Sequence, residues 1–256
     1  MCAQLVKLDV QDYVATVTLD HPPVNALNSV LRQDIIETFD AITDRDDIRV
    51  AILTGAGKNF CAGADLKDRP NVEQPGAYGR HNRVTRETTN AIRECGKPVI
   101  AAVNGAALGA GLGLMVACDI MLASDDAVFG MPEINVGLAG GATTLRTLFG
   151  RSRMRRMLFT GYRVPAAELY RVGIIECCVP RERLLDEAMA IAREIAGKSP
   201  LGIKYAKISC NLTELTPSRE VYRFEQGYTV ELAKTEDAQE AKRAFLEKRK
   251  PRFKGR

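Results

Sequence analysis

Three glycine-rich turns are the segments of this 256-residue chain whose composition best suits chemistry. They are Cys61–Asp65, Gly105–Gly113 and Gly137–Ala142, and each follows a predicted strand. Glycine lets the backbone approach a ligand closely, and open α/β sheets bind ligands beyond the carboxyl ends of their strands. Two such turns can supply one N–H group each to a developing oxyanion. Glycines that merely form turns and close packing are the alternative.

Individual reactive side chains give weaker evidence of a catalytic site than these turns. Cys61 lacks a nearby base motif, so we expect a buried packing residue rather than a nucleophile. His81 lies between arginines and is expected on the surface, while Asp65 and Asp119 are expected to stabilise turns. The chain has two histidines and no C-x-x-C pair, which argues against a zinc site held by protein ligands.

Composition excludes several broad classes. The chain is 46% hydrophobic, which is too apolar for a disordered protein. Its seven scattered cysteines predict reduced thiols, as in a cytoplasmic or organelle-matrix protein, and the polar sequence after Met1 does not predict a signal peptide. No G-x-G-x-x-G, P-loop or G-x-S-x-G motif occurs, so dinucleotide, P-loop and hydrolase-elbow functions lack sequence support.

The C-terminal segment 242–256 is strongly basic, with eight basic side chains and one acidic side chain. A solvated charged face is one interpretation. A docking point for an anion, either nucleic acid or a phosphate-bearing small molecule, is the other. Phe245 and Phe253 interrupt the charges, which favours a packed helix end over a free tail.

Residues 99–118 carry no charge over twenty positions, which is long enough to cross a bilayer. The segment is mostly Ala and Gly, contains Asn104 and lacks flanking aromatic residues, so a buried strand followed by a tightly packed helix is the better interpretation.

Hydrophobic periodicity predicts the elements that must position the turns. We expect strands at 4–10, 13–19, 49–54, 99–104, 119–123 and 127–130, the first two as a hairpin. We expect helices at 29–43, 80–95, 144–160, 165–172, 182–197, 201–213, 217–234 and 237–249. Alternating strands and helices in the first half predict a largely parallel, buried sheet. The helical remainder wraps its own core or joins a neighbouring subunit.

A set of ordered motifs resembles one family across essentially the whole chain. The motifs are Phe60–Leu66 (FCAGADL), Lys97–Gly105 (KPVIAAVNG), Ala107–Gly111 (ALGAG), Cys118–Ile120 (CDI), Phe129–Ile134 (FGMPEI), Gly161, Gly173–Ile175 (GII) and Ala244–Pro251 (AFLEKRKP). Together they are similar to the crotonase superfamily, the enoyl-CoA hydratase/isomerase family.

The resemblance implies an α/β fold, a spiral of ββα units with a helical C-terminal region used in trimerisation. It implies a core at 1–195, which holds the acyl-CoA site, and a helical extension at 196–256. A homotrimer or a dimer of trimers is the expected assembly. The ligand is an acyl-CoA thioester, so coenzyme A enters as part of the substrate and no separate cofactor, metal or membrane partner is expected.

The family's catalytic groups fall on Ala64, Ala110 and Glu133. The resemblance makes the backbone N–H groups of Ala64 and Ala110 an oxyanion hole for the thioester carbonyl. Hydratases of the family hold water with two glutamates, of which one falls at Glu133 and the other is replaced here by Gly113. One buried carboxylate can still move a proton between C2 and C4 of an enoyl thioester.

Coenzyme A contacts follow from the same resemblance. Backbone at Ala26 and at Asp65, Leu66 and Lys67 is expected to hold the adenine and pantetheine. Phe245 and Lys248 are expected to reach the nucleotide from a neighbouring subunit. Many relatives carry Lys where this chain has Val24, which removes one expected phosphate contact.

The sequence thus predicts an enzyme of fatty acid or acyl-CoA metabolism that hydrates a double bond or shifts it from Δ3 to Δ2. Gly113 favours the shift. Two other functions remain open: a family member that binds RNA through its basic surface, although no aromatic-rich RNA module is present, and a CoA-binding protein with little activity.

Overall fold

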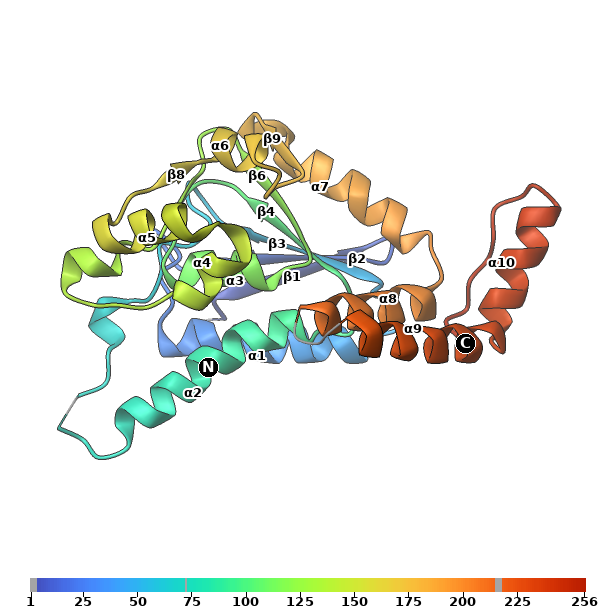
Figure 1. Cartoon of the computed structure of the whole chain (residues 1–256), viewed down its shortest axis with the longest axis horizontal. Coiled ribbons are helices and arrows are strands. Elements are labelled where there is room, and N and C mark those ends of the chain that lie inside the picture. The colour runs from blue at the N-terminus through green and yellow to red at the C-terminus, as the bar shows by residue number, and fades with distance from the viewer. Residues whose placement is uncertain (1–3, 72, 215–217) are drawn as a thin grey trace.

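A six-stranded sheet forms the centre of the computed structural model, which describes residues 4–71, 73–214 and 218–256 (Figure 1). Its strand order is β1-β2-β3-β4-β6-β9. The first pair is the expected antiparallel hairpin, and the other pairs are parallel. The strands are β1 (Val6–Gln11), β2 (Val14–Leu19), β3 (Val50–Gly55), β4 (Val99–Val103), β6 (Ile120–Ser124) and β9 (Cys177–Val179).

Helices cover both faces of this sheet, which explains why its central strands β3 and β4 are almost entirely apolar. Every residue of β3 and β4 is buried. Alternate residues enter two separate cores. Leu53 and Ala101 pack with the helices at Ser29–Asp44 and Ala110–Ala117 on one face, and Ile52 and Ile100 pack with the helix at Arg181–Ala196 on the other. The period-two alternation of a strand therefore supplies both layers from one sequence run.

The helices of the α/β half largely match the predicted ranges. They are α1 (Ser29–Asp44), α2 (Ala77–Arg93), α3 (Ala110–Ala117), α4 (Ala142–Leu148), α5 (Arg151–Thr160), α6 (Ala166–Arg171) and α7 (Arg181–Ala196). The single helix expected at 144–160 was wrong, because extended Phe149 and Gly150 separate α4 from α5. The helix expected from residue 80 begins at Ala77, after the left-handed Gly76.

A second, three-stranded sheet anchors two of the three glycine-rich turns, those at Cys61–Asp65 and Gly105–Gly113. It consists of β5 (Ala107–Leu108), β7 (Val128–Gly130) and β8 (Val164–Pro165). Two isolated parallel bridges, Cys61 to Ala107 and Leu27 to Ala64, attach the segment after β3 to this sheet and to the chain before α1. Short 3₁₀ helices follow at η1 (Leu66–Asp68) and η2 (Pro132–Val136). The turns are thereby fixed relative to the main sheet.

Three helices complete the chain: α8 (Pro200–Thr213), α9 (Ser218–Ala233) and α10 (Glu236–Leu246). In Figure 1 they extend along one side, and α10 projects beyond the sheet. The first residue of the helix expected at 217–234 lies outside the described residues. The helix expected to end at 249 stops at Leu246, and the tail then folds back along α10.

Among the described residues, no helix is long and apolar enough to cross a membrane. The uncharged segment 99–118 forms β4, β5 and α3 instead, which confirms the strand-and-helix interpretation. The domain boundary expected at 195/196 falls at the end of α7 and stays a prediction.

Candidate active site

Two backbone N–H groups from separate turns are free of protein acceptors in the described structure. In the bridge between Leu27 and Ala64, the Leu27 N–H donates to Gly63 O and the Asp65 N–H donates to Leu27 O, both near 3 Å. Alternation along an extended chain therefore turns the Ala64 N–H to the other side. Ala110 is the first residue of α3, where N–H groups have no partner within the helix.

Glycines bring these two turns together. A Cβ built on Gly63 would lie 2.8 Å from the Leu108 carbonyl oxygen and 3.7 Å from the Ala110 nitrogen. A Cβ on Gly111 would overlap the Cys61 carbonyl group. The positive φ of the second turn falls on Gly109, at 54°, and not on Ala110, so alanine is compatible with position 110.

Glu133 lies in η2, directly after Pro132 at the start of that 3₁₀ helix. Its carboxylate packs so closely on Gly109 that a Cβ there would overlap it. The Oε2 atom is buried and has no hydrogen-bond partner. Burial raises the pKa of Glu133 from its usual value of 4.5, while its own backbone N–H and the Arg69 charge oppose that rise. A buried carboxylate with a raised pKa is suited to both accepting and donating a proton.

A cavity of about 280 Å³ connects Glu133 with Ala110. Its wall includes Gly113 from α3, Thr89 from α2 and Arg32 from α1. Gly113 leaves space, since a Cβ there would meet only the Thr89 Cγ2 atom, at 3.8 Å. The structure thus places the turn that contains Ala64 next to Ala110, and Ala110 and Glu133 in the wall of one cavity, beside an open position at Gly113. The catalytic roles of the three residues stay a prediction.

Sequence reasoning missed the arginines of this region. Arg32 is only 2% exposed although it is charged, and the Nε atom of Arg69 is also buried without a partner. A signal for Arg32 existed: it is spaced three and seven residues before Ile35 and Phe39, on the buried stripe of α1. A cation on such a stripe indicates either an internal partner or a ligand.

The other side chains considered at the outset have structural roles. Cys61 is fully buried, and burial raises the pKa of its thiol to about 12, which rules out a ready nucleophile. Asp65 caps η1 by accepting from the Lys67 N–H at 2.9 Å. Asp119 accepts from the Val99 N–H and from Lys207. His81 is half-buried on α2, and burial followed by the charges of Arg32 and Arg69 lowers its pKa.

The residues expected to hold coenzyme A fall into two separated groups. Ala26 and Asp65 lie on neighbouring segments joined through Leu27, and Leu66 and Lys67 follow in the exposed η1. Phe245 lies in the last turn of α10 and Lys248 just after it; in Figure 1 α10 projects at one end of the molecule, and the segment that contains residues 65–67 lies toward the other end. Phe245 is 83% exposed. A single chain therefore does not unite the two groups.

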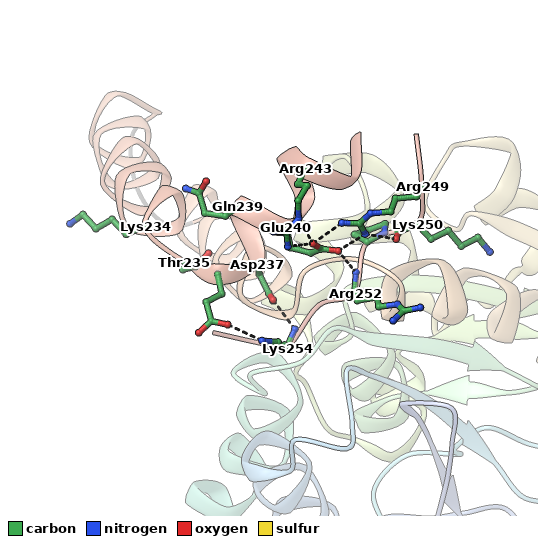
Figure 2. Close-up of a pocket in the computed structure, with 12 residues that line it drawn as sticks. Lys234, Thr235, Asp237, Gln239, Glu240, Arg243, Arg249, Lys250, Arg252 and Lys254 are labelled. Atoms are coloured by element: carbon green, nitrogen blue, oxygen red, sulfur yellow. Dashed lines mark hydrogen bonds and ion pairs between the residues drawn. The ribbon is translucent and has the colours of Figure 1, made fainter. Parts of the chain in front are cut away.

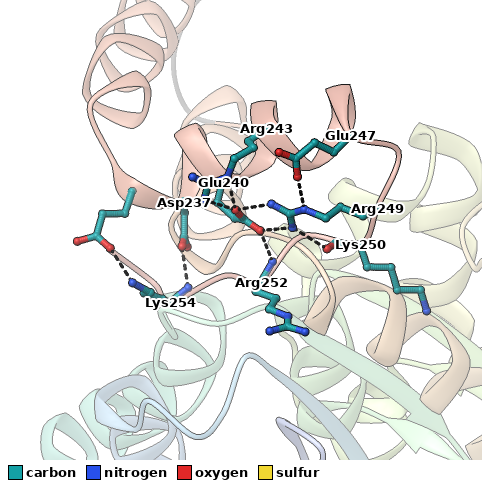
Figure 3. Close-up of polar contacts among 9 residues, drawn as sticks. Asp237, Glu240, Arg243, Glu247, Arg249, Lys250, Arg252 and Lys254 are labelled. Atoms are coloured by element: carbon teal, nitrogen blue, oxygen red, sulfur yellow. Dashed lines mark hydrogen bonds and ion pairs between the residues drawn. The ribbon is translucent and has the colours of Figure 1, made fainter.

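The basic tail is held by ion pairs, as Figures 2 and 3 show. Glu240 accepts from Arg243 and Arg249 and from the Arg252 N–H. Asp237 accepts from the Lys254 and Gly255 N–H groups. These residues line a hollow of about 920 Å³. The hydrogen bonds from Arg249 and Arg243 hold the pKa of Glu240 well below its usual value. A packed end, rather than a free tail, is confirmed.

Comparison with known proteins places this geometry in a family. A model of the enoyl-CoA hydratase/isomerase family matches residues 9–256. A Rhodococcus jostii (7aS)-7a-methyl-1,5-dioxo-2,3,5,6,7,7a-hexahydro-1H-indene-carboxyl-CoA hydrolase is 39% identical, over 94% of this chain and 93% of its own length. An Escherichia coli 2,3-dehydroadipyl-CoA hydratase is 33% identical, over 96% and 97%.

A solved structure shares the whole fold. The enoyl-CoA hydratase from Bacillus anthracis superposes with a TM-score of 0.92 at 32% identity, covering 99% of this chain and 100% of that one. The spiral α/β architecture with C-terminal helices is therefore confirmed. With paired backbone donors beside a buried glutamate on that fold, this chain belongs to the enoyl-CoA hydratase/isomerase (crotonase) family of acyl-CoA enzymes.

Proposed function

We propose that this protein catalyses proton transfer on an acyl-CoA thioester, with Glu133 as the acid/base and the Ala64 and Ala110 N–H groups as the oxyanion hole. The observation that carries the proposal is the buried, unpartnered Oε2 atom of Glu133 in a cavity shared with Ala110. A buried carboxylate oxygen without a hydrogen bond destabilises the fold unless a ligand donates to it or a proton neutralises it.

The chemistry follows from where charge develops. Glu133 removes a proton from C2 of a 3-enoyl thioester, and the C–H electron pair moves into the thioester as a dienolate. Its negative charge rests on the carbonyl oxygen, which the two N–H groups stabilise; each such donor contributes on the order of 10²–10³ in rate. The proton on Glu133 then returns to C4, which leaves a 2-enoyl thioester.

Hydration is the less favoured reaction. Two carboxylates hold the attacking water in the family's hydratases, and Gly113 leaves one of those positions empty. Glu133 alone can activate water, but with half of the hydrogen-bonding support. The space left beside Gly113 would be available to the acyl group instead.

A second candidate is hydrolysis of an oxo-substituted acyl-CoA, as in the name of the Rhodococcus jostii relative. The 39% identity and the widened cavity at Gly113 favour it. Glu133 would take a proton from water as its oxygen adds to the thioester carbonyl, and the same two N–H groups would stabilise the resulting oxyanion. The C–S bond would then break, and coenzyme A would leave as the thiol with that proton.

Coenzyme A binding is proposed to need two subunits of a trimer or a dimer of trimers. Ala26 and the segment 65–67 would hold the adenine and pantetheine in one subunit, and Phe245 and Lys248 would reach the nucleotide from its neighbour. The exposure of Phe245 on a projecting helix supports this arrangement.

The test is a substrate panel assayed with wild type and Glu133→Gln. We expect 3-enoyl thioesters to be isomerised faster than 2-enoyl thioesters are hydrated, and both activities to require Glu133. Release of free acid from oxo-substituted thioesters would favour the hydrolase. Absence of turnover together with tight CoA binding would favour the weakly active protein, and salt-dependent RNA binding would favour the RNA-binding alternative.

A further inference from the structure

Arg32 is a buried cation in the wall of the candidate active site. It projects from α1 and is 2% exposed, whereas arginine is almost never fully buried unless it is paired. Removing a guanidinium from water is unfavourable, and a native fold offsets that penalty with a hydrogen-bond acceptor.

No acceptor for the Arg32 guanidinium is present among the described residues, and its Nε atom is buried and unsatisfied. Burial lowers its pKa, and the Cys61 thiol and the Asp68 carboxylate oppose that effect. Asp68 is already engaged: its carboxylate accepts from the backbone N–H and the hydroxyl of Ser29. Asp68 therefore acts on Arg32 through space without bonding to it.

The surroundings add positive charge. Arg69 lies close enough to lower the pKa of Arg32, and its own Nε is buried without a partner. Arg86 of α2 lines the same cavity. Against these stand Asp68 and Glu133, and the pKa of Glu133 is raised. The cavity wall thus carries two arginines, Arg32 and Arg86, and one carboxylate, Glu133, which leaves Arg32 without a bonded anion.

We propose that Arg32 binds a carboxylate carried by the acyl group of the substrate, which makes acyl-CoA thioesters with a second, free carboxylate the substrate class. The inference rests on the proposed function, because Arg32, Ala110 and Glu133 line one cavity. A thioester carbonyl at Ala110 directs its acyl group into that cavity. A carboxylate there pairs with the fork of the guanidinium and neutralises its charge, which a ketone or methyl group does not.

Binding of unreactive, saturated thioesters tests this without any turnover. The probes are the monothioesters of butanedioic, hexanedioic and octanedioic acid with coenzyme A, each paired with the methyl-ended thioester of equal length. For at least one length, wild type should bind the carboxylate form about 10- to 100-fold tighter by calorimetry, the range of a charge-assisted hydrogen bond. Arg32→Met should abolish that preference, and Arg32→Lys should retain part of it.

Lys207→Met is the matched control, since Lys207 is a buried cation outside this cavity that is paired with Asp119. It should leave the carboxylate preference unchanged. The proposal is overturned if wild type binds the carboxylate form no more tightly than the methyl-ended form at every length, or if Arg32→Met retains the preference. A preference without any turnover of unsaturated thioesters would support Arg32 while rejecting the proposed reaction.

Discussion

Two buried cations of this protein differ in their partners, and the difference separates structure from function. Lys207 in α8 is 7% exposed, and its Nζ atom donates to Asp119 Oδ2 at 2.9 Å and to the Lys97 carbonyl at 3.0 Å. Arg32 in α1 is 2% exposed and has no acceptor among the described residues. Lys207 joins α8 to the sheet, whereas Arg32 faces a cavity.

Two carboxylates, Glu240 and Glu133, differ in the same way. Glu240 is surrounded by donors from Arg243, Arg249 and the Arg252 backbone, and holds the tail on α10. Glu133 has a buried oxygen without any donor. Since folding selects for paired buried charges, the unpaired ones mark the groups that await a ligand.

The largest expected effect is on turnover. Glu133→Gln should lower kcat by about 10²–10⁴-fold, the usual contribution of a general acid/base, because only proton transfer is lost. Binding of a saturated acyl-CoA should persist. Glu168→Gln is the control: that carboxylate is paired with Arg153 and Arg171, and its replacement should leave kcat unchanged. Comparable turnover in Glu133→Gln would refute the assignment.

The two buried cations should also differ in their effect on stability, with the larger loss expected when the paired Lys207 is replaced. Lys207→Met leaves the carboxylate of Asp119 with the Val99 N–H as its remaining donor and should lower the free energy of unfolding by about 2 kcal/mol, the usual contribution of a hydrogen bond between charged groups. Arg32→Met removes an unpaired charge and should leave stability equal or higher. Urea denaturation measures both. A larger loss for Arg32→Met would mean that Arg32 is a structural residue.

Gly113→Glu should raise hydration of 2-enoyl thioesters by about tenfold or more, a modest share of what a positioned acid/base contributes. The Cβ fits, since its nearest contact is Thr89 at 3.8 Å, and glycine is about 1 kcal/mol worse than alanine in a helix. The new carboxylate raises one pKa of the pair by repulsion, which limits the gain. Gly113→Ala is the control without a carboxylate. Fast hydration by wild type would contradict this prediction.

Lys248→Ala should weaken acyl-CoA binding by about fivefold and reduce its salt dependence, because an exposed charge contributes about 1 kcal/mol or less. The value of kcat should stay the same. Lys242→Ala provides a control from the same basic tail. An unchanged KM would show that the end of α10 is not part of the coenzyme A site.

The smallest expected effect is the pH dependence of stability. The native pKa of Glu133 is raised, so folding favours its protonated form. Stability from that preference is present below the unfolded pKa of about 4.3 and is lost as pH rises through the native value. Relative to wild type, Glu133→Gln should therefore become more stable as pH rises from 4 to 7. An unchanged difference would indicate a solvated carboxylate.

Much of this site is predictable from sequence because its donors are main-chain groups. Close backbone contacts require glycine at 63 and 111, and a positive φ together with the adjacent Glu133 carboxylate requires it at 109, so the turns have a recognisable sequence motif. The strands β3 and β4 are apolar on both faces, so their burial is equally visible.

Arg32 and the helix breaks were harder to predict. The position of Arg32 on the apolar stripe of its helix indicates that it is buried. That it lacks an acceptor is visible only in the folded structure, where α1, α2 and α3 pack around one cavity. The break between α4 and α5 depends on an extended Phe149 that enters the core, and helical periodicity continues through it. The three-residue strand β9 is too short to produce a pattern.

Exchange of acyl-CoA protons with deuterated water tests the central claim most directly, since it needs neither a double bond nor a known product. A saturated thioester that binds, such as the hexanedioic monothioester, is incubated in D₂O and followed by NMR at the carbon next to the thioester. Wild type should replace those protons with deuterium, and Glu133→Gln should lose this exchange while still binding the thioester. Equal exchange by both proteins, or none by wild type with the thioester bound, would contradict Glu133 as the group that moves the proton.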